Sequence, residues 1–281
     1  MTTNPATTFT QTLMQKLLGR NYKWLFILGF YFKSTGTGVS GFLVSQVSDI
    51  VQVLGITYIW IINKSPNEVI TYLIIGRIFK ALSDCFCAEV IAPEVANGKI
   101  SNYLMLPTPF LPLYFFREVG RRIVLNIGRA ISLFVAVAIF FRYIDLKVIN
   151  LSNLILLPFL ICLSFVLSYF IEFSVGFSMS FFDDKRNYEG LRKAYNGIAG
   201  LGGILTGVLI PLDKLPFYAQ FIQFLPTTFF LHHPMQIFLG KYSPLETLFV
   251  FLGGIGWCVV LYFMAKWVFK LGLKKNESVG L

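Results

Sequence analysis

Apolar residues along the chain fall into long continuous blocks, and short basic clusters separate these blocks. A helix needs about 20 apolar residues to cross roughly 30 Å of hydrocarbon. Six blocks meet or approach this length: Val39–Ile62, Val69–Ile91, Ile123–Phe141, Asn153–Phe181, Asn196–Pro211 and Glu246–Phe269. The blocks are continuous rather than alternating between apolar and polar positions, which argues against a transmembrane β-barrel. The pattern therefore predicts an all-α integral membrane protein with six transmembrane helices.

Two further segments are neither spans nor simple loops. In Phe9–Phe32, apolar residues recur near helical spacing with basic residues on the other faces, which predicts an amphipathic interfacial helix on the cytoplasmic membrane surface. Leu212–Lys241 is rich in aromatic residues and interrupted by prolines, which predicts a helical hairpin in the outer leaflet between the fifth and sixth spans. The expected organisation is a cytoplasmic N-terminus with its interfacial helix (1–38), a six-helix transmembrane domain (39–269) and a cytoplasmic basic tail (270–281).

Composition supports the membrane interpretation. Of the 281 residues, 56% are hydrophobic and 14% are charged, whereas a soluble domain is roughly 45–50% apolar and about 25% charged. This balance excludes a soluble enzyme, a disordered chain and a disulfide-stapled secreted domain. The four cysteines all lie in apolar segments, where they are expected to pack as small hydrophobic residues rather than bind metal.

The formal charge of +10 is informative because of where the basic residues lie. They flank the apolar spans, which indicates membrane topology rather than a nucleic-acid partner. Loops on one side of the six predicted spans hold 15 lysines and arginines, and loops on the other side hold 5. Cytoplasmic loops carry the excess of basic residues, so both termini are expected in the cytoplasm.

Charged residues inside the predicted spans are costly and rarely face lipid. Asp49, Lys80 and Glu172 are expected near the membrane midplane, from a rise of about 1.5 Å per helical residue. Asp84 follows Lys80 by four residues and Arg77 precedes it by three, so these side chains share one side of a helix. We predict an ion network of Asp49, Lys80, Asp84 and Glu172 inside the bundle. It is either purely structural, which is the favoured interpretation, or part of a gate, a substrate path or a proton relay.

Two spans carry stripes of small or polar residues at steps of three and four. The stripes are Gly38, Gly41, Ser45, Ser48, Asp49 and Gln52 in the first span, and Ala199, Gly203, Gly207 and Pro211 in the fifth. Small residues at this spacing let helix backbones approach closely. The stripes therefore indicate packing within one subunit, or else a subunit interface or the wall of a translocation path.

Motifs of soluble catalysis are missing from the sequence. It contains no G-x-x-x-x-G-K-[ST] phosphate-binding loop, no H-E-x-x-H and no G-x-S-x-G. The two histidines, His232 and His233, are adjacent and lie in the aromatic segment, so no metal site and no catalytic residue are expected. The alternative function left open is a membrane-embedded lipid-modifying enzyme, for which His232, His233 and Glu246 form the best available cluster.

The segment after the second span combines helix signals with apolar residues on a cytoplasmic loop. Pro93 suits the start of a helix, and Asn97-Gly98 indicates a turn. Beyond this turn, Ile100, Tyr103, Leu104 and Leu106 are expected to expose apolar side chains. The segment therefore predicts a short helix that docks to another protein, or one that packs on the lipid surface.

Two stretches of the sequence resemble a known family, the permease subunits of type-2 ABC exporters. One matching stretch is Glu94…Gly98-Lys99-Ile100…Leu104…Leu106-Pro107, which is similar to the family's cytoplasmic segment between the second and third spans. The other runs from Gly203 to Pro216 and continues to Leu225-Pro226-Thr227 and Pro234. It resembles a glycine-containing fifth span followed by aromatic outer-leaflet helices.

The resemblance implies an exporter without its own ATPase. Two permeases, as a homodimer or heterodimer, would form the path in a bacterial cytoplasmic membrane, and each would dock a separate nucleotide-binding ATPase subunit that holds ATP and Mg²⁺. No cofactor is expected on this chain, and the substrate would be a hydrophobic or amphipathic molecule such as a lipid, drug, peptide or glycan. The coupling residues would be Glu94, Gly98, Lys99, Ile100, Tyr103, Leu104, Leu106 and Pro107. The dimer seam or path would take Ser45, Ser48, Asp49, Gln52, Ala199, Gly203, Gly207 and Pro211.

Overall fold

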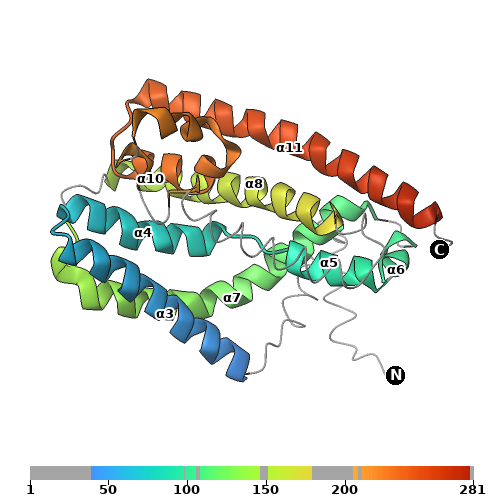
Figure 1. Cartoon of the computed structure of the whole chain (residues 1–281), viewed down its shortest axis with the longest axis horizontal. Coiled ribbons are helices and arrows are strands. Elements are labelled where there is room, and N and C mark those ends of the chain that lie inside the picture. Colours follow the sequence, from blue (N-terminus) through green and yellow to red (C-terminus); the bar gives the residue numbers. More distant parts are fainter. Residues whose placement is uncertain are drawn as a thin grey trace, which may run out of the picture.

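Every regular element in the described part of the chain is a helix (Figure 1). The computed structural model describes residues 39–97, 99–105, 108–145, 151–178, 205–207, 211–214 and 216–278. The predicted interfacial helix Phe9–Phe32 and most of the predicted fifth span lie outside these residues. The expected helical class is confirmed within them.

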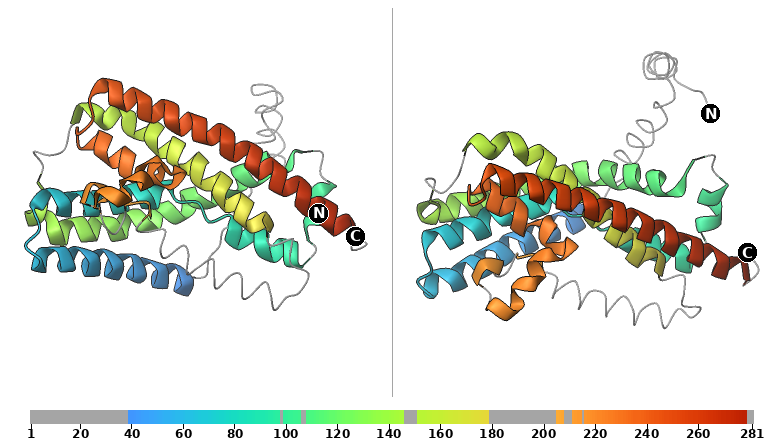
Figure 2. Two further views of the ribbon diagram at one scale, coloured as in Figure 1. Left: turned by 45° about the horizontal axis from the view of Figure 1, so that its top comes forward. Right: turned by 90° about the horizontal axis from the view of Figure 1, so that it is seen from above.

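Among the described residues, five long helices form the bundle: α3 (Val39–Ile62), α4 (Asn67–Ser83), α7 (Phe110–Phe140), α8 (Leu157–Ser178) and α11 (Pro244–Ser278). α11 packs along α8, and α3 packs along α7 (Figures 1 and 2). α4 lies between these two pairs and contacts both α7 and α8. The C-terminal ends of α3 and α7 and the N-terminal ends of α4 and α8 lie at one end of the bundle, and the C-terminal ends of α8 and α11 lie at the other.

Length and composition separate the helices into two groups. Asn153–Ser178 and Pro244–Lys274 are long and apolar enough to cross a membrane on their own. In α3 and α7 only the shorter stretches Ile50–Ile62 and Leu133–Tyr143 are comparably apolar. The remaining part of α7 carries the charged residues that form the polar contacts described below.

The predicted second span, Val69–Ile91, is wrong as a single helix. α4 ends at Ser83, four residues without helical structure follow, and α5 (Ala88–Ala96) begins the next helix. A five-residue helix, α6 (Ile100–Leu104), then leads to α7. The residues between α4 and α7 therefore form a separate structure at one end of the bundle, where Figure 1 shows α5 and α6 together.

Two other predicted boundaries need correction. α7 begins at Phe110, 13 residues before the predicted start of the third span, because Pro109 sets the N-terminus and the basic stretch after it is helical. α11 continues to Ser278, so most of the predicted basic tail is part of the last helix. The predicted bounds of α3 agree with the structure.

The region after the predicted fifth span is a compact set of short helices. η6 (Leu212–Lys214), η7 (Phe217–Phe224) and η8 (Pro226–Phe230) are 3₁₀ helices, and α10 (His232–Phe238) follows them. Proline stands before η7 and at the start of η8, which explains the breaks. Every residue of α10 is buried, and α10 contacts α8. This part of the predicted hairpin is therefore enclosed by protein.

The predicted fifth helix does not continue to Pro211. Thr206 and Gly207 form a turn in which Gly207 has a φ of +81°. A Cβ atom at Gly207 would lie 2.8 Å from the Tyr72 hydroxyl, so only glycine fits both the conformation and the space. The predicted stripe on one helix face is therefore wrong at Gly207 and Pro211, and its members Ala199 and Gly203 lie outside the described residues.

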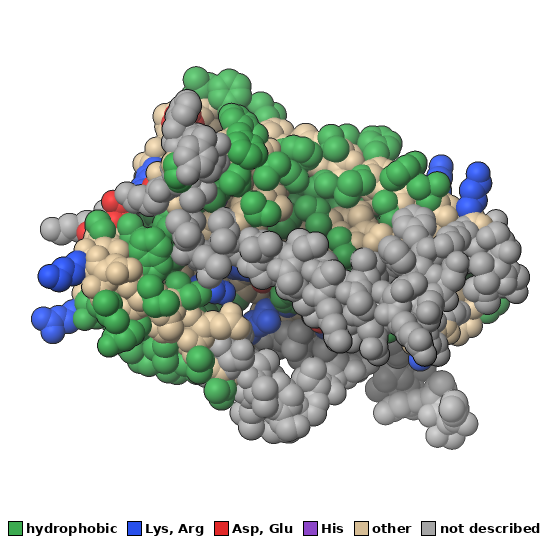
Figure 3. All heavy atoms as spheres, in the orientation of Figure 1, with side chains coloured by type: hydrophobic (Ala, Val, Ile, Leu, Met, Phe, Trp, Pro, Cys, Tyr) green, Lys and Arg blue, Asp and Glu red, His purple; other side chains and the backbone are tan. Residues whose placement is uncertain are grey.

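Large apolar side chains cover the outside of the bundle, as expected for contact with lipid. Such residues on α11 include Leu245, Phe249, Leu252, Val260, Phe263 and Trp267. Figure 3 shows hydrophobic side chains over α11, with lysine and arginine at the two ends of the molecule. A few basic side chains also stand in a recess in the middle of this face.

Candidate coupling site

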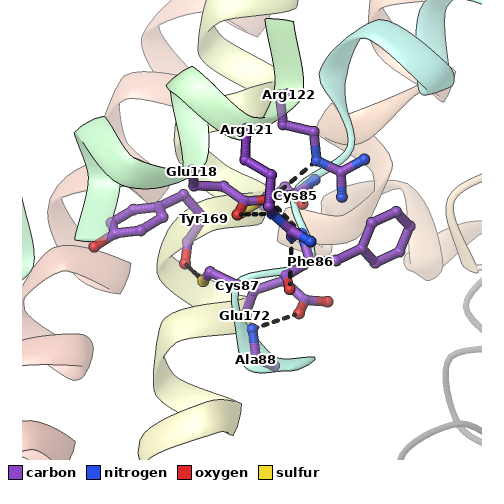
Figure 4. Close-up of polar contacts among 10 residues, drawn as sticks. Cys85, Phe86, Cys87, Ala88, Glu118, Arg121, Arg122, Tyr169 and Glu172 are labelled. Atoms are coloured by element: carbon purple, nitrogen blue, oxygen red, sulfur yellow. Dashed lines mark hydrogen bonds and ion pairs between the residues drawn. The ribbon is translucent and has the colours of Figure 1, made fainter. Parts of the chain in front are cut away.

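The break between α4 and α5 is stabilised by side chains from two other helices. The N–H of Cys85 donates to Ser168 Oγ at 3.3 Å, and the N–H of Ala88 donates to Glu172 Oε2 at 3.3 Å. Between them, the N–H of Phe86 donates to Glu118 Oε1 at 3.2 Å. Buried backbone N–H groups are costly unless they find hydrogen-bond partners inside the protein. α7 and α8 supply these partners (Figure 4).

Glu118 on α7 is the centre of this arrangement. Its carboxylate accepts hydrogen bonds from Arg121 Nε at 2.9 Å, Arg121 Nη2 at 2.8 Å and Arg122 Nε at 3.0 Å. Arg121 Nη2 also donates to the carbonyl oxygen of Phe86 at 3.2 Å. One buried carboxylate therefore joins two guanidinium groups and the backbone of the break, as the dashed lines in Figure 4 show.

The protonation of Glu118 follows from these contacts. Burial by itself would raise the pKa of Glu118. The hydrogen bond from Arg121 and the charges of Arg121 and Arg122 outweigh burial, so the pKa of Glu118 lies below its usual range. Glu118 is therefore ionised at neutral pH and acts as a fixed counter-ion rather than as a proton donor.

A second cluster, around Glu94, joins α5 and α6 to α7. Arg117 makes a two-pronged contact with Glu94, with Nη2 to Oε1 at 2.8 Å and Nη1 to Oε2 at 3.0 Å. The Tyr114 hydroxyl also donates to Glu94, and the Tyr103 hydroxyl donates to Glu94 Oε1 at 3.4 Å. The Arg117 guanidinium lies over the rings of both tyrosines, 5.2 Å from that of Tyr114 and 5.7 Å from that of Tyr103.

An aromatic core supports the same region from inside the bundle. Phe110 stacks on Tyr114 with ring centroids 4.4 Å apart and on Phe269 at 5.0 Å. Phe177 of α8 meets Phe110 edge to face at 5.3 Å. Such pairs stabilise packing beyond the area they bury. The start of α7 and the ends of α8 and α11 therefore hold one another beneath α5 and α6.

The outer surface of α6 differs from the predicted coupling surface. Ile100 is 4% exposed and packs in the aromatic core, so the expectation that it is exposed for docking is wrong. Leu104 and Met105 are 45% and 77% exposed, and Lys99 is also exposed. Tyr103 is half-buried in the Glu94 cluster. The predicted coupling residues Gly98, Leu106 and Pro107 lie outside the described residues.

The predicted ion network forms only in part. Lys80 Nζ lies 2.5 Å from Asp84 Oδ1, which confirms their pairing along α4. Glu172 is placed at the start of α5 instead, where its carboxylate caps the N-terminus at Ala88. Arg77 Nη1 donates to Gln52 Oε1 on α3 at 3.5 Å. The side chains of Asp49, Ser45 and Ser48 are outside the described part of the structure.

The residues considered for an enzymatic alternative serve structural contacts. His233 Nδ1 lies 2.9 Å from the Tyr242 hydroxyl and Nε2 lies 2.9 Å from the carbonyl oxygen of Gln223, so both ring nitrogens are occupied. Glu246 accepts the N–H of Ser243 at 2.7 Å, which caps the N-terminus of α11. Burial, followed by the neighbouring His233, lowers the pKa of His232 to about 4. This geometry does not assemble an acid–base site.

Sequence reasoning missed Glu118, Tyr114 and the structural role of Arg117. Glu118 precedes Arg121 by three residues and Arg122 by four, a spacing that signals ion pairs once the segment is recognised as helix. The pair Glu94–Arg117 spans 23 residues and two helices, so no local pattern reveals it.

Comparison with known proteins identifies the family. The model of the ABC-2 family transporter proteins matches residues 63–280, which cover α4 through α11 and therefore both charged clusters. The comparison with curated proteins finds no match. The chain belongs to the ABC-2 family of transporter proteins and is a multi-pass membrane permease of an ABC transporter.

Proposed function

We propose that this permease exports a hydrophobic or amphipathic molecule, powered by a separate nucleotide-binding subunit that docks on α6. ATP and Mg²⁺ belong to that subunit. A second permease, identical or related, completes the translocation path, with the polar face of α3 and the glycine-containing fifth span at the seam. Both termini face the cytoplasm, in a bacterial cytoplasmic membrane.

One observation carries the docking proposal: α6 exposes two large apolar side chains at the end of the bundle where α7 begins and α8 and α11 end. Leu104 and Met105 are 45% and 77% exposed at the C-terminal end of this helix. Exposed apolar side chains among polar neighbours are typical of a contact surface for another protein. Lys99, Ser101 and Asn102 supply the polar surroundings.

The contacts beneath α6 suit a helix that transmits movement from the ATPase subunit to the bundle. Ile100 anchors the helix in the aromatic core, and Tyr103 joins it to Glu94 and Arg117. A displacement of Leu104 is therefore transmitted to α7 through ion pairs and hydrogen bonds rather than through a flexible loop. Since Glu118 fixes the α4–α5 break to α7, the same displacement is also transmitted to the C-terminal end of α4.

Co-purification of the ATPase subunit with variants of α6 tests the proposal. Leu104→Asp and Met105→Asp each place a charge where a partner would bury an apolar side chain, and we expect each to reduce recovery of the ATPase about tenfold or more. Asn63→Asp is the matched control, because it adds the same charge at an exposed position at the far end of the bundle. Recovery with Asn63→Asp should equal that of the unmodified chain.

Two results would separate the possible failures. If the α6 variants elute as folded permease yet retain the ATPase, docking occurs elsewhere and the assignment of α6 is wrong. If the unmodified chain also recovers no ATPase while remaining folded, the proposed partnership itself fails.

A further inference from the structure

The last helix, α11, carries apolar side chains and lysines on one continuous exposed face. Residues that follow one another by three, four or seven positions lie on the same face of a helix. On the opposite side of α11, Ala265 and Val268 pack in the aromatic core. The exposed face holds, in order, Leu248, Leu252, Val259, Phe263, Lys266, Lys270 and Lys274. The three lysines, which we call the basic stripe, therefore extend the outer apolar face of the helix.

The position of the basic stripe along α11 matches the border of a bilayer. Hydrocarbon is about 30 Å thick, and the headgroup layers extend a bilayer to about 40–45 Å. We measure from Leu245, the first large apolar residue exposed on α11. A rise of about 1.5 Å per residue places Lys266, Lys270 and Lys274 about 32, 38 and 44 Å along the helix axis. This face of α11 is thus apolar across the hydrocarbon and basic where the headgroups begin.

An aromatic residue marks the same border. Trp267 is 63% exposed and follows Lys266 directly, and tryptophan is enriched at the level of lipid headgroups. The Lys266 Nζ atom lies 5.0 Å from the centroid of the Tyr262 ring. A lysine at this depth rests its apolar stem on the helix while its ammonium group reaches toward the headgroups. Figure 3 shows basic side chains at the end of the molecule where α11 ends.

The positive charge of this end of α11 is not offset within the helix. Its acidic residues are Glu246, in the first turn, and Glu277, close to the C-terminal end. After Tyr262, the helix holds four lysines against the one glutamate Glu277, which leaves a charge of +3. The stretch 179–204, which lies outside the described residues, holds four basic and three acidic residues. It therefore adds no excess of negative charge.

Acidic side chains on the neighbouring elements have partners of their own. α8 packs along α11, and α5, α6 and α7 meet it through the aromatic core. Among the described residues, no ion pair joins an acidic side chain to the basic stripe. The acidic residues here are Glu172, bonded to the N–H of Ala88, Glu94, paired with Arg117, Glu118, paired with Arg121 and Arg122, and Glu89, whose charge acts on Arg121.

We propose that the basic stripe binds the headgroups of anionic phospholipids, in the leaflet at the α6 end of the bundle. Acyl chains pack on the apolar residues of the same face, which brings the lipid phosphate to Lys266 and Lys270. Lys274 adds positive charge from the water side. The continuity of the stripe with the apolar face favours a lipid over a protein partner, because one lipid molecule covers both parts. Binding requires neither ATP nor the ATPase, so this inference stands apart from the proposed function.

Fluorescence quenching of Trp267 by brominated phosphatidylglycerol tests the site, with the purified full chain in uncharged detergent micelles. Trp267→Phe, made in each background, supplies the signal of the other tryptophans for subtraction. Brominated phosphatidylglycerol should quench at a concentration at least about tenfold lower than brominated phosphatidylcholine. Because each lysine beside an anionic lipid strengthens binding about fivefold, Lys266→Gln/Lys270→Gln should reduce this preference about tenfold or more. Lys266→Arg/Lys270→Arg should retain it.

Lys64→Gln/Arg142→Gln is the matched control, because it removes two positive charges from exposed positions at the opposite end of the bundle. It should leave the preference for phosphatidylglycerol unchanged.

Three results would overturn the inference. Equal quenching of the unmodified chain by the two lipids would remove the role of charge. An equal preference in Lys266→Gln/Lys270→Gln and Lys64→Gln/Arg142→Gln would show that the stripe does not recognise the headgroup. If Lys266→Gln/Lys270→Gln keeps the preference but no longer recovers the ATPase, the lysines bind the partner protein instead.

Discussion

Glu118→Gln isolates the charge that holds the α4–α5 break to α7. Glutamine keeps the shape of the side chain and one acceptor oxygen, but it removes the negative charge that faces Arg121 and Arg122. It also turns an amide group toward one of the donors. Arg122 is then left as a buried cation, because its Nε–H bond to Glu118 is the contact that offsets its charge.

The size of the effect follows from burial. The side chains of Glu118 and Arg122 are 3% and 4% exposed, so solvent screens their attraction little. Removing one partner of a buried ion pair typically costs about 3–5 kcal/mol. Arg121 is 22% exposed and regains water contact, so its share is smaller. We expect Glu118→Gln to reduce the free energy of unfolding by about 3–5 kcal/mol, which shifts the unfolding equilibrium by a factor of about 10² to 10³ or more.

Equilibrium unfolding in detergent micelles measures this loss. Glu89→Gln is the matched control, since Glu89 is exposed on α5 close to the break, and it should cost less than about 1 kcal/mol. The double variant Glu118→Gln/Arg122→Met should recover part of the stability, because it removes the uncompensated cation. If Glu118→Gln and Glu89→Gln lose the same stability, the buried pair is not what holds the break, and the reasoning fails.

Two further predictions concern other parts of the fold. Gly207→Ala should lower the free energy of unfolding by about 1–3 kcal/mol, because it combines a φ of +81° with a Cβ atom 2.8 Å from the Tyr72 hydroxyl. Gly256→Ala, where no atom lies within 4 Å of the new Cβ, should raise the stability of α11 instead. A melting temperature that moves the same way in both variants would contradict this. Because the folded pKa of His232 is about 4 and lies below its ordinary 6.5, the unfolded chain binds the proton more readily. Stability should therefore fall on the order of 3 kcal/mol as pH drops from 6.5 through 4. His232→Gln should flatten the melting temperature over this range, and an unchanged pH profile would rule out His232 as the cause.

The sequence predicts a helix most directly where the apolar run is long and continuous. α8 and α11 are continuous apolar runs, and every side of such a helix can face either lipid or other apolar side chains. α3 was also predicted with the correct bounds. These elements depend on the local sequence, because their backbone hydrogen bonds are all made within the helix.

The break after Ser83 could not be predicted in the same way. Neither proline nor glycine, the residues that most often mark the end of a helix, occurs in Asp84–Cys87. The break is stable because Ser168, Glu172 and Glu118 accept its N–H groups, and these partners lie 32 to 84 residues away in the chain. A local pattern contains no information on such partners, so tertiary structure decides this boundary.

In the candidate site, the orientation of α6 also depends on tertiary structure rather than on the local sequence. An apolar residue on a cytoplasmic loop was expected to face outward, yet Ile100 packs inward while Leu104 is exposed. A helix of five residues has too few turns for periodicity to tell its two faces apart. Which side of α6 is buried depends on the aromatic core beneath it, and side chains of α7, α8 and α11 form that core.

The charged clusters also bear on the predicted orientation. Arg117, Arg121 and Arg122 were counted among fifteen basic loop residues, but they belong to α7 and have carboxylate partners. Without these three, twelve basic residues remain on the predicted cytoplasmic side against five on the other. The bias persists, and acidic residues have little influence on such a count. The prediction of cytoplasmic termini therefore does not depend on the arginines that build the coupling site, and the two inferences can be tested independently.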